Sequence, residues 1–286
     1  MKEYIKLARP HHWAKNVLVL LPLLCSGQIL EWARLRAGLW GFLAFSLLAS
    51  GIYVINDIRD REKDRLNTTK CHRPIASGKI RVPQAVAYCA GLLVLAVGCC
   101  YLASGMNWRC WAAFLGYFLL NLGYSFGLKN VPLVDIAILV SGFLLRMVYG
   151  GAVTEIVLSK WLCLTIISIS FFMGLGKRRG ELMGQTSTRS VLKFYSESFL
   201  DKNLYMCVAL AVMFYSLWTV DEMTVARVGS ENLIWTVPLM ILICLKYSLN
   251  VEGDSDGDPV EVLLHDKILL LLIGILGLVI FALIYI

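Results

Sequence analysis

Apolar residues run along this chain in long segments that alternate with short polar stretches. Most of these segments are about 18–22 residues long, which as a helix spans the ~30 Å of hydrocarbon in a bilayer. We therefore expect an all-α fold, a polytopic membrane bundle of about nine transmembrane helices. The segments cover residues 17–30, 37–56, 82–103, 110–126, 131–153, 160–176, 203–220, 232–250 and 268–286. No polar stretch between them is long enough to fold alone, so residues 1–286 are predicted to form a single domain.

The composition supports a membrane protein and excludes an ordinary soluble enzyme. Hydrophobic residues make up 58% of the 286 positions, and the mean hydropathy is +0.69. The first 16 residues are basic and amphipathic without a small-residue cleavage pattern, so no cleaved signal peptide is expected. The nine cysteines form no CxxC pair and lie mainly in the apolar segments, which favours packing roles over disulfides or metal ligands.

The basic residues are distributed unevenly between the two ends of the predicted helices. Of the 27 lysines and arginines, 21 lie on the side that includes the N-terminus and 5 on the other. Because basic loops stay in the cytoplasm, we expect a plasma-membrane protein with a cytoplasmic N-terminus and active site and an external C-terminus. The net charge of +7 suits anionic membrane lipid or phosphorylated substrates. No nucleic acid is expected as a partner, and a homo-oligomer is compatible with this architecture.

The most informative polar stretch runs from Asn56 to Arg81 and holds four acidic and eight basic residues. Asp57, Asp60 and Asp64 follow the spacing i, i+3, i+7, which places three carboxylates on one face of a helix. Mg²⁺ prefers a few carboxylates together with phosphate oxygens and water. The spacing therefore predicts a magnesium site beside phosphate-binding basic residues, although surface ion pairs would also account for the charges.

Two motifs in this stretch carry a family resemblance. The pattern NDxxDxxxD begins at Asn56, and RPIASG begins at Arg73. Together they resemble the first aspartate-rich motif of the UbiA superfamily of intramembrane prenyltransferases, whose members have nine helices. The resemblance implies that Asp57, Asp60 and Asp64 bind Mg²⁺, which holds a substrate diphosphate.

A second stretch separates this chain from ordinary members of that superfamily. Ordinary members carry a DxxxD motif after the sixth helix, whereas this chain has GKRRGEL over residues 176–182. That basic stretch is similar to the phosphoribosyltransferase branch of the superfamily. Three further stretches fit the same branch: RPHHWAKN from Arg9, YSFGLK from Tyr124 and DPVE from Asp258.

This branch implies the transfer of 5-phosphoribose from 5-phosphoribosyl 1-diphosphate to a polyprenyl phosphate, with release of diphosphate, for envelope polysaccharide synthesis. The acceptor is already an anion, so no general base is required, and inversion at C1 is expected. The resemblance implies catalytic roles for Asp57, Asp60, Lys177 and Arg178. The residues expected to bind substrate are Lys15, Asn56, Arg73, Tyr124, Lys129, Arg146 and Glu181.

Two of these assignments have purely structural alternatives. Lys177 and Glu181 are spaced i, i+4 and would also form an ordinary surface ion pair. Arg146 lies within an apolar segment, where facing lipid would cost at least ~2.5 kcal/mol, so it should face the bundle. Asp135 precedes it by 11 residues on nearly the same helix face. The two could line one polar cavity, or Arg146 could make a buried structural pair.

Two other functions are compatible with the same residues. A UbiA-type prenyltransferase would move an isoprenyl chain from its diphosphate to an aromatic or other acceptor, although the second DxxxD motif is missing. A transporter of phosphorylated lipid would use the basic face without requiring Mg²⁺.

Overall fold

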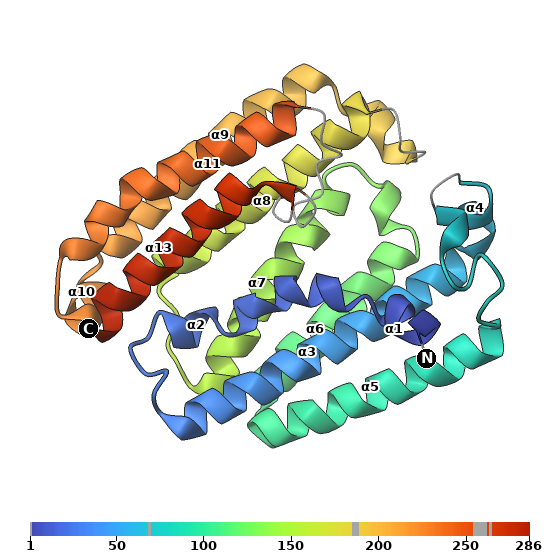
Figure 1. The fold of residues 1–286 in the computed structure, drawn as a ribbon, viewed down its shortest axis with the longest axis horizontal. Coiled ribbons are helices and arrows are strands. Elements are labelled where there is room, and N and C mark those ends of the chain that lie inside the picture. The colour runs from blue at the N-terminus through green and yellow to red at the C-terminus, as the bar shows by residue number, and fades with distance from the viewer. Residues whose placement is uncertain (1, 68–69, 185–188, 254–261, 263–264) are drawn as a thin grey trace. The chain divides into compact units, whose positions relative to one another are not determined.

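Helices make up all the regular structure in the computed structural model, which describes residues 2–67, 70–184, 189–253, 262 and 265–286 (Figure 1). The α-helices are α1 (Lys2–Ala8), α2 (Leu21–Leu24), α3 (Trp32–Arg59), α4 (Arg61–Arg65), α5 (Val82–Ser104), α6 (Trp108–Ser125), α7 (Val134–Thr154), α8 (Lys160–Met183), α9 (Glu197–Thr219), α10 (Glu222–Val228), α11 (Val237–Glu252) and α13 (Lys267–Tyr285). The 3₁₀ helices are η1 (Pro10–Val19), η2 (Lys70–His72), η3 (Leu128–Asn130), η4 (Ser190–Phe194) and η5 (Asn232–Thr236).

Seven helical segments in this part of the chain are long and apolar enough to cross a membrane. The predicted all-α membrane fold is therefore confirmed, and the predicted 110–126 segment is present as the 18-residue α6. The first predicted segment, 17–30, differs: η1 ends at Val19 and α2 has four residues. Pro22 lies inside α2, and because proline lacks an N–H and clashes with the preceding turn, it prevents a long helix there.

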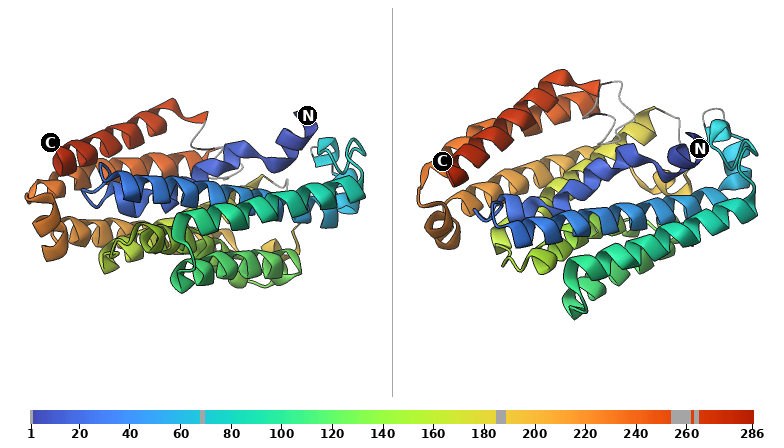
Figure 2. Two further views of the ribbon diagram at one scale, coloured as in Figure 1. Left: turned by 90° about the horizontal axis from the view of Figure 1, so that it is seen from below. Right: turned by 60° about the horizontal axis from the view of Figure 1, so that its bottom comes forward.

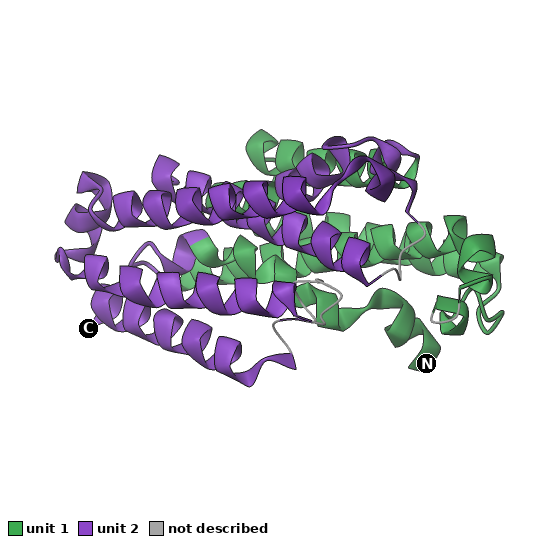
Figure 3. Ribbon diagram, turned by 90° about the horizontal axis from the view of Figure 1, so that it is seen from above, with its two compact units in different colours: residues 1–21, 31–126, 145–155 green, residues 22–30, 127–144, 156–286 purple. Residues whose placement is uncertain are grey.

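The chain divides into two compact units (Figure 3). Unit 1 comprises residues 1–21, 31–126 and 145–155, and unit 2 comprises residues 22–30, 127–144 and 156–286. The expectation of a single domain stays a prediction. Each of the two charged clusters described below lies within one unit.

Unit 1 is built around α3, with α5 running beside it (Figures 1 and 2). Its apolar core contains four aromatic rings that contact one another, with Phe45 at the centre. The Phe45 ring centroid lies 6.0 Å from Phe114, 5.0 Å from Tyr117 and 4.6 Å from Tyr149. Contacts at these distances stabilise beyond area burial, so α3, α6 and α7 are fixed together at this layer.

The segment from Ala8 to Val19 is bound along one face of α3. Ser46 and Ser50 are one turn apart on that face. Asn16 Nδ2 donates to Ser46 Oγ at 3.1 Å, and Ser50 Oγ donates to the Ala8 carbonyl at 2.7 Å. These hydrogen bonds offset the cost of burying the two hydroxyls, and they fix the position of the segment along α3. The registration matters because Arg9 lies in this segment.

The end of η1 approaches α7 very closely. A Cβ atom at Gly150 would lie 2.0 Å from the Val19 carbonyl oxygen, so only glycine fits this position. The approach locks η1 between α3 and the second half of α7 within unit 1.

Unit 2 is built around α8, which packs against α9 and α11. The Phe172 and Tyr247 rings are 5.0 Å apart in its apolar core. Asp266 caps α13 by accepting the backbone N–H groups of Ile268 and Leu269, and it lies 2.8 Å from Lys246 Nζ. The hydrogen bond from Lys246, together with the helix N–H groups, holds the pKa of Asp266 below its usual range.

Candidate active site

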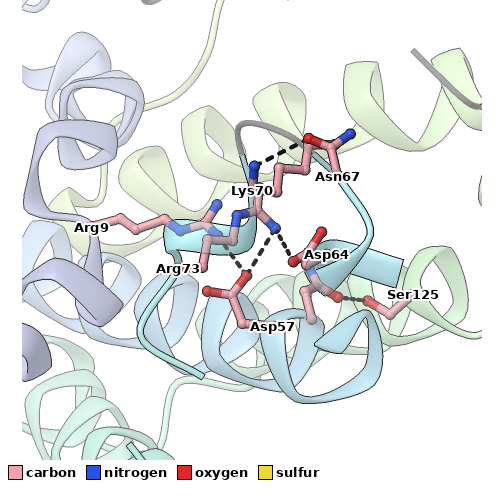
Figure 4. Close-up of polar contacts among 8 residues, drawn as sticks. Arg9, Asp57, Asp64, Asn67, Lys70, Arg73 and Ser125 are labelled. Carbon is pink, nitrogen blue, oxygen red and sulfur yellow. Dashed lines mark hydrogen bonds and ion pairs between the residues drawn. The ribbon is translucent and has the colours of Figure 1, made fainter. Parts of the chain in front are cut away.

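The predicted carboxylates come together at the junction between α3 and α4. Asp57 lies in the last turn of α3 and Asp64 in α4, and their side chains are only 2% and 7% exposed. Arg73 Nη1 lies 3.2 Å from Asp57 Oδ1 and 2.7 Å from Asp64 Oδ2, so one guanidinium joins both (Figure 4). The helix is interrupted at Asp60, which is half-buried between α3 and α4. The structure therefore brings Asp57 and Asp64 to one cation and leaves Asp60 at the break.

The loop that follows α4 holds Arg73 in place. Ile75 and Ile80 are buried in an apolar cluster with Val54. The Ala76 carbonyl accepts Arg65 Nε at 3.1 Å, and Gly78 has a φ of +77°, a conformation that glycine adopts without strain. The RPIASG motif is therefore a rigid turn that presents its arginine to the carboxylates.

Arg9 is a second cation at this site and was missing from the predicted site residues. Arg9 Nη2 lies 2.5 Å from Asp57 Oδ1, and its guanidinium lies 5.3 Å from the centre of the Tyr53 ring. Its φ of 52° is uncommon for a residue other than glycine, and the proline that follows disfavours the ordinary helical conformation. The only sequence feature that could have indicated a role for Arg9 is the Arg9-Pro10 pair that opens the RPHHWAKN stretch. We call Arg9, Asp57, Asp64 and Arg73 the aspartate cluster.

Asn56 and the end of α6 border the aspartate cluster. The Ser125 hydroxyl, labelled in Figure 4, contacts Asn56 Oδ1 and also lies 2.7 Å from the Asn121 carbonyl. Tyr124, the residue before it, is half-buried. The contact with Ser125 holds the amide of Asn56, the residue before Asp57, against α6. The substrate-binding roles of Asn56 and Tyr124 stay predictions.

The aspartate cluster has the chemistry to hold a divalent cation with help from a ligand. Asp57 and Asp64 supply hard oxygen atoms, and both already converge on one positive group. In the described residues, no group of three or more His, Cys, Asp or Glu side chains is arranged to hold a metal. Mg²⁺ is commonly bound by one or two carboxylates plus substrate phosphates and water, so the pair fits that ion. The participation of Asp60 stays a prediction.

The second predicted cluster lies in unit 2 and is centred on Arg178. Arg178 and Asp135 both have an exposed fraction of 0%, and Arg178 Nε lies 2.6 Å from Asp135 Oδ2. Arg178 Nη1 lies 2.7 Å from Glu181 Oε2. The Tyr195 hydroxyl donates to Asp135 Oδ1 at 2.7 Å and accepts the Leu133 N–H. We call Arg178, Asp135, Glu181 and Tyr195 the arginine cluster.

Tyr195 is a stable donor in the arginine cluster. Burial and its hydrogen bond to Asp135 raise the pKa of Tyr195 to about 12. The hydroxyl therefore keeps its proton at neutral pH and continues to donate to the carboxylate. Asp135 and Tyr195 were absent from the predicted site, because sequence spacing does not reveal partners 60 residues apart.

The structure changes the interpretation of the basic stretch on α8. Glu181, expected to bind substrate or to pair with Lys177, has contacts that include Arg178 and Arg189, the latter at 3.5 Å. Arg178, for which the resemblance implies a catalytic role, has no exposed surface and two carboxylate partners, and that role stays a prediction. Arg178 would therefore affect a bound ligand only indirectly, by positioning Asp135 and Glu181. Lys177 and Lys129 are half-buried, and their phosphate-binding roles stay predictions.

Arg146 faces the interior of unit 1, as its position in an apolar segment predicts. Arg146 Nε donates to Asn16 Oδ1 at 2.7 Å, and Nη2 donates to the Tyr117 hydroxyl at 2.8 Å. Asp135, considered as a neighbour of Arg146 in a polar cavity, is held by Arg178 and Tyr195. The geometry is that of a buried structural pairing with η1, and a substrate role for Arg146 or the half-buried Lys15 stays a prediction. The DPVE stretch, 258–261, lies outside the described residues.

Comparison with known proteins identifies relatives along nearly the whole chain. Residues 18–256 match the UbiA prenyltransferase family. The chain is 38% identical over 273 residues to a decaprenyl-phosphate phosphoribosyltransferase from Corynebacterium glutamicum, covering 93% of this chain and 81% of that protein. It is 37% identical over 293 residues to a decaprenyl-phosphate phosphoribosyltransferase from Mycolicibacterium smegmatis, covering 96% and 91%.

A solved structure supports the fold independently. The structure of a UbiA homolog from Archaeoglobus fulgidus bound to GPP and Mg²⁺ matches with a TM-score of 0.73 and 21% sequence identity. The match covers 98% of this chain and 97% of that one. The helical arrangement is therefore shared even though most residues differ.

Proposed function

Because the chain belongs to the UbiA prenyltransferase family, we propose that this integral membrane transferase moves 5-phosphoribose from 5-phosphoribosyl 1-diphosphate to a polyprenyl phosphate. The 37–38% identity to two decaprenyl-phosphate phosphoribosyltransferases supports this substrate pair. The observation that carries the proposal is the basic stretch on α8. Instead of an acidic pair, it contains Lys177, a half-buried cation that suits an additional phosphate on the donor, next to Arg178, which is paired with Asp135 and Glu181.

The reaction exchanges one C1–O bond for another. The bond from C1 of the ribose to the diphosphate breaks, and diphosphate leaves with the bonding electrons. An anionic oxygen of the polyprenyl phosphate forms the new bond from the opposite face, which inverts C1. Neither step needs a side chain that removes a proton, so positioning and charge stabilisation are the contributions expected of the protein.

The aspartate cluster is the proposed binding place for the leaving group. Asp57 and Asp64 would hold Mg²⁺, with Asp60 as a proposed third ligand, and the bound ion would neutralise charge on the departing diphosphate. Arg73, fixed by its turn, lies where it can bind a phosphate oxygen next to these carboxylates. Lys177 and Lys129 are proposed as phosphate-binding residues from the sequence alone, while Arg178 orients Glu181 and Asp135.

The test is a donor and acceptor screen with the purified full-length protein. With Mg²⁺ present, diphosphate should appear only when 5-phosphoribosyl 1-diphosphate and a polyprenyl phosphate are supplied together. The product lipid should carry a phosphoribosyl group by mass spectrometry. Absence of diphosphate release with this pair, in protein that keeps its melting temperature, would refute the proposal.

Prenyl transfer is the second candidate, because the family match and the GPP-bound homolog favour it. In the same screen it would give consumption of a prenyl diphosphate by an aromatic or other acceptor without any ribose donor. Lipid transport is distinguished by the absence of covalent product and of an Mg²⁺ requirement.

We also propose that the aspartate cluster faces the cytoplasm of the plasma membrane, because most basic residues lie on the N-terminal side. A reporter fused after Ile286 should then be active only if it works outside the cytoplasm. Activity of a strictly cytoplasmic reporter at that end would contradict this orientation.

A further inference from the structure

Within the aspartate cluster, the acids are buried and the arginines are the more exposed members. Asp57 and Asp64 side chains are 2% and 7% exposed, whereas Arg9 and Arg73 are 19% and 29% exposed. Arg9 and Arg73 both lie within ion-pair distance of Asp57 Oδ1. A cation that binds this oxygen must therefore compete with two guanidinium groups.

The charges of the cluster determine which combination of ligands it can accept. Two carboxylates and two guanidinium groups sum to zero. A divalent cation bound alone would leave two surplus positive charges beside buried acids, which is unfavourable where the effective dielectric constant is low. A diphosphate bound together with the cation would more than offset this surplus positive charge, and guanidinium groups bind phosphate oxygens in paired hydrogen bonds.

The backbone next to Arg9 is held by contacts that do not involve the Arg9 side chain. The carbonyl of the preceding residue, Ala8, is held by Ser50, and Trp13 Nε1 donates to the same serine at 3.0 Å. The guanidinium lies near the Tyr53 ring, a surface along which it can turn while keeping a favourable cation–π contact. The side chain can therefore leave Asp57 while the rest of the segment stays bound to α3.

We infer that Arg9 is a diphosphate-binding residue that is held by Asp57 until a divalent cation takes that carboxylate over. The inference rests on the proposed function for the diphosphate, and it adds a consequence that the proposed function does not require. Metal and diphosphate bind cooperatively, because each removes the charge that opposes the other. Arg9 weakens binding of the metal alone and strengthens binding of diphosphate once the metal is present.

Binding measurements on the full-length detergent-purified protein test this inference without any phosphoribosyl donor. Calorimetry would measure Mg²⁺ alone and then inorganic diphosphate at saturating Mg²⁺. In Arg9→Gln, Mg²⁺ alone should bind about tenfold more tightly, because one competing cation is gone. Diphosphate should bind about tenfold more weakly, because one charged hydrogen-bonding group is lost. These opposite changes are not expected from a residue that only supports the fold.

Two further variants complete the test. Arg9→Lys keeps the charge but loses the planar fork, so Mg²⁺ affinity should stay within about twofold while diphosphate affinity falls several-fold. Arg61→Gln removes the same charge from a surface pair with Glu62, and both affinities should stay near those of the unchanged protein. If Arg9→Gln is unstable, Arg9→Lys decides the question.

Equal or same-direction changes in Arg9→Gln, or an unchanged diphosphate affinity in Arg9→Lys, would overturn the inference. A failure of phosphoribosyl transfer in the donor screen would leave these binding results standing. The two ideas can therefore fail separately.

Discussion

Replacing Arg178 by alanine is expected to lower the free energy of unfolding by about 3–5 kcal/mol, the usual cost of leaving a buried charge without its partner. Arg178 and Asp135 have no exposed surface, so the Asp135 carboxylate would lose its buried counter-charge. The Tyr195 hydroxyl remains as a donor to Asp135, but it carries no charge. Unfolding of the detergent-solubilised protein, followed by circular dichroism in increasing dodecyl sulfate, would measure the loss.

The neighbouring arginine provides a matched control for this prediction. Arg179 pairs with Asp201 at 2.6 Å, but that aspartate is 31% exposed. Arg179→Ala should therefore cost about 1 kcal/mol or less. Adding Asp135→Asn to Arg178→Ala should recover part of the loss, because the buried negative charge disappears with its partner. Equal effects of Arg178→Ala and Arg179→Ala would show that the buried pair is not a special source of stability.

Replacing Asp57 by asparagine is expected to reduce the rate of diphosphate release by about 100-fold or more, equivalent to ~3 kcal/mol of transition-state stabilisation. Asparagine keeps the shape of the side chain but removes the charge that would bind the metal. Asp64→Asn should have a similar effect, because the two acids converge on the same cation. Steady-state rates over a range of Mg²⁺ concentrations would measure the change, which should include a higher half-saturating Mg²⁺ concentration.

Glu62 is the appropriate control for these substitutions. It lies between the two aspartates in sequence, but its side chain is 64% exposed and pairs with Arg61 and Arg65. The hydrogen bond from Arg61 lowers the pKa of Glu62, so it is also ionised at neutral pH. Glu62→Gln should leave turnover within about twofold. An Asp57→Asn protein with normal stability and unchanged turnover would remove the aspartate cluster from the proposed mechanism.

The parts of the site that sequence reasoning could predict are those determined by local spacing. Asp57 and Asp64 are seven residues apart, and two helical turns bring them together even though the helix is interrupted at Asp60. The buried position of Arg146 also followed from one physical fact, the cost of a charge in lipid. The all-helical membrane fold followed from the length of the apolar segments, which depends only on composition and order.

The parts that could not be predicted depend on which distant residues meet. Arg9 reaches Asp57 across 48 positions, and Arg178 reaches Asp135 across 43. Helical periodicity placed Asp135 and Arg146 on nearly the same helix face, but in the structure Asp135 pairs with Arg178 from another helix. Periodicity describes one helix at a time, and it cannot rank partners that belong to different helices. The first predicted helix, residues 17–30, was wrong for a local reason, because Pro22 interrupts a long helix there.

The attachment of the Ala8–Val19 segment to α3 has a consequence for biosynthesis. This segment is synthesised before α3: its partners Ser46, Ser50 and Asp57 follow its own contact residues by 30, 42 and 48 positions. The contacts of this segment with α3 can therefore form only after α3 has been made. An N-terminal fusion that delays this docking would yield a protein that is inserted in the membrane but has an incomplete aspartate cluster.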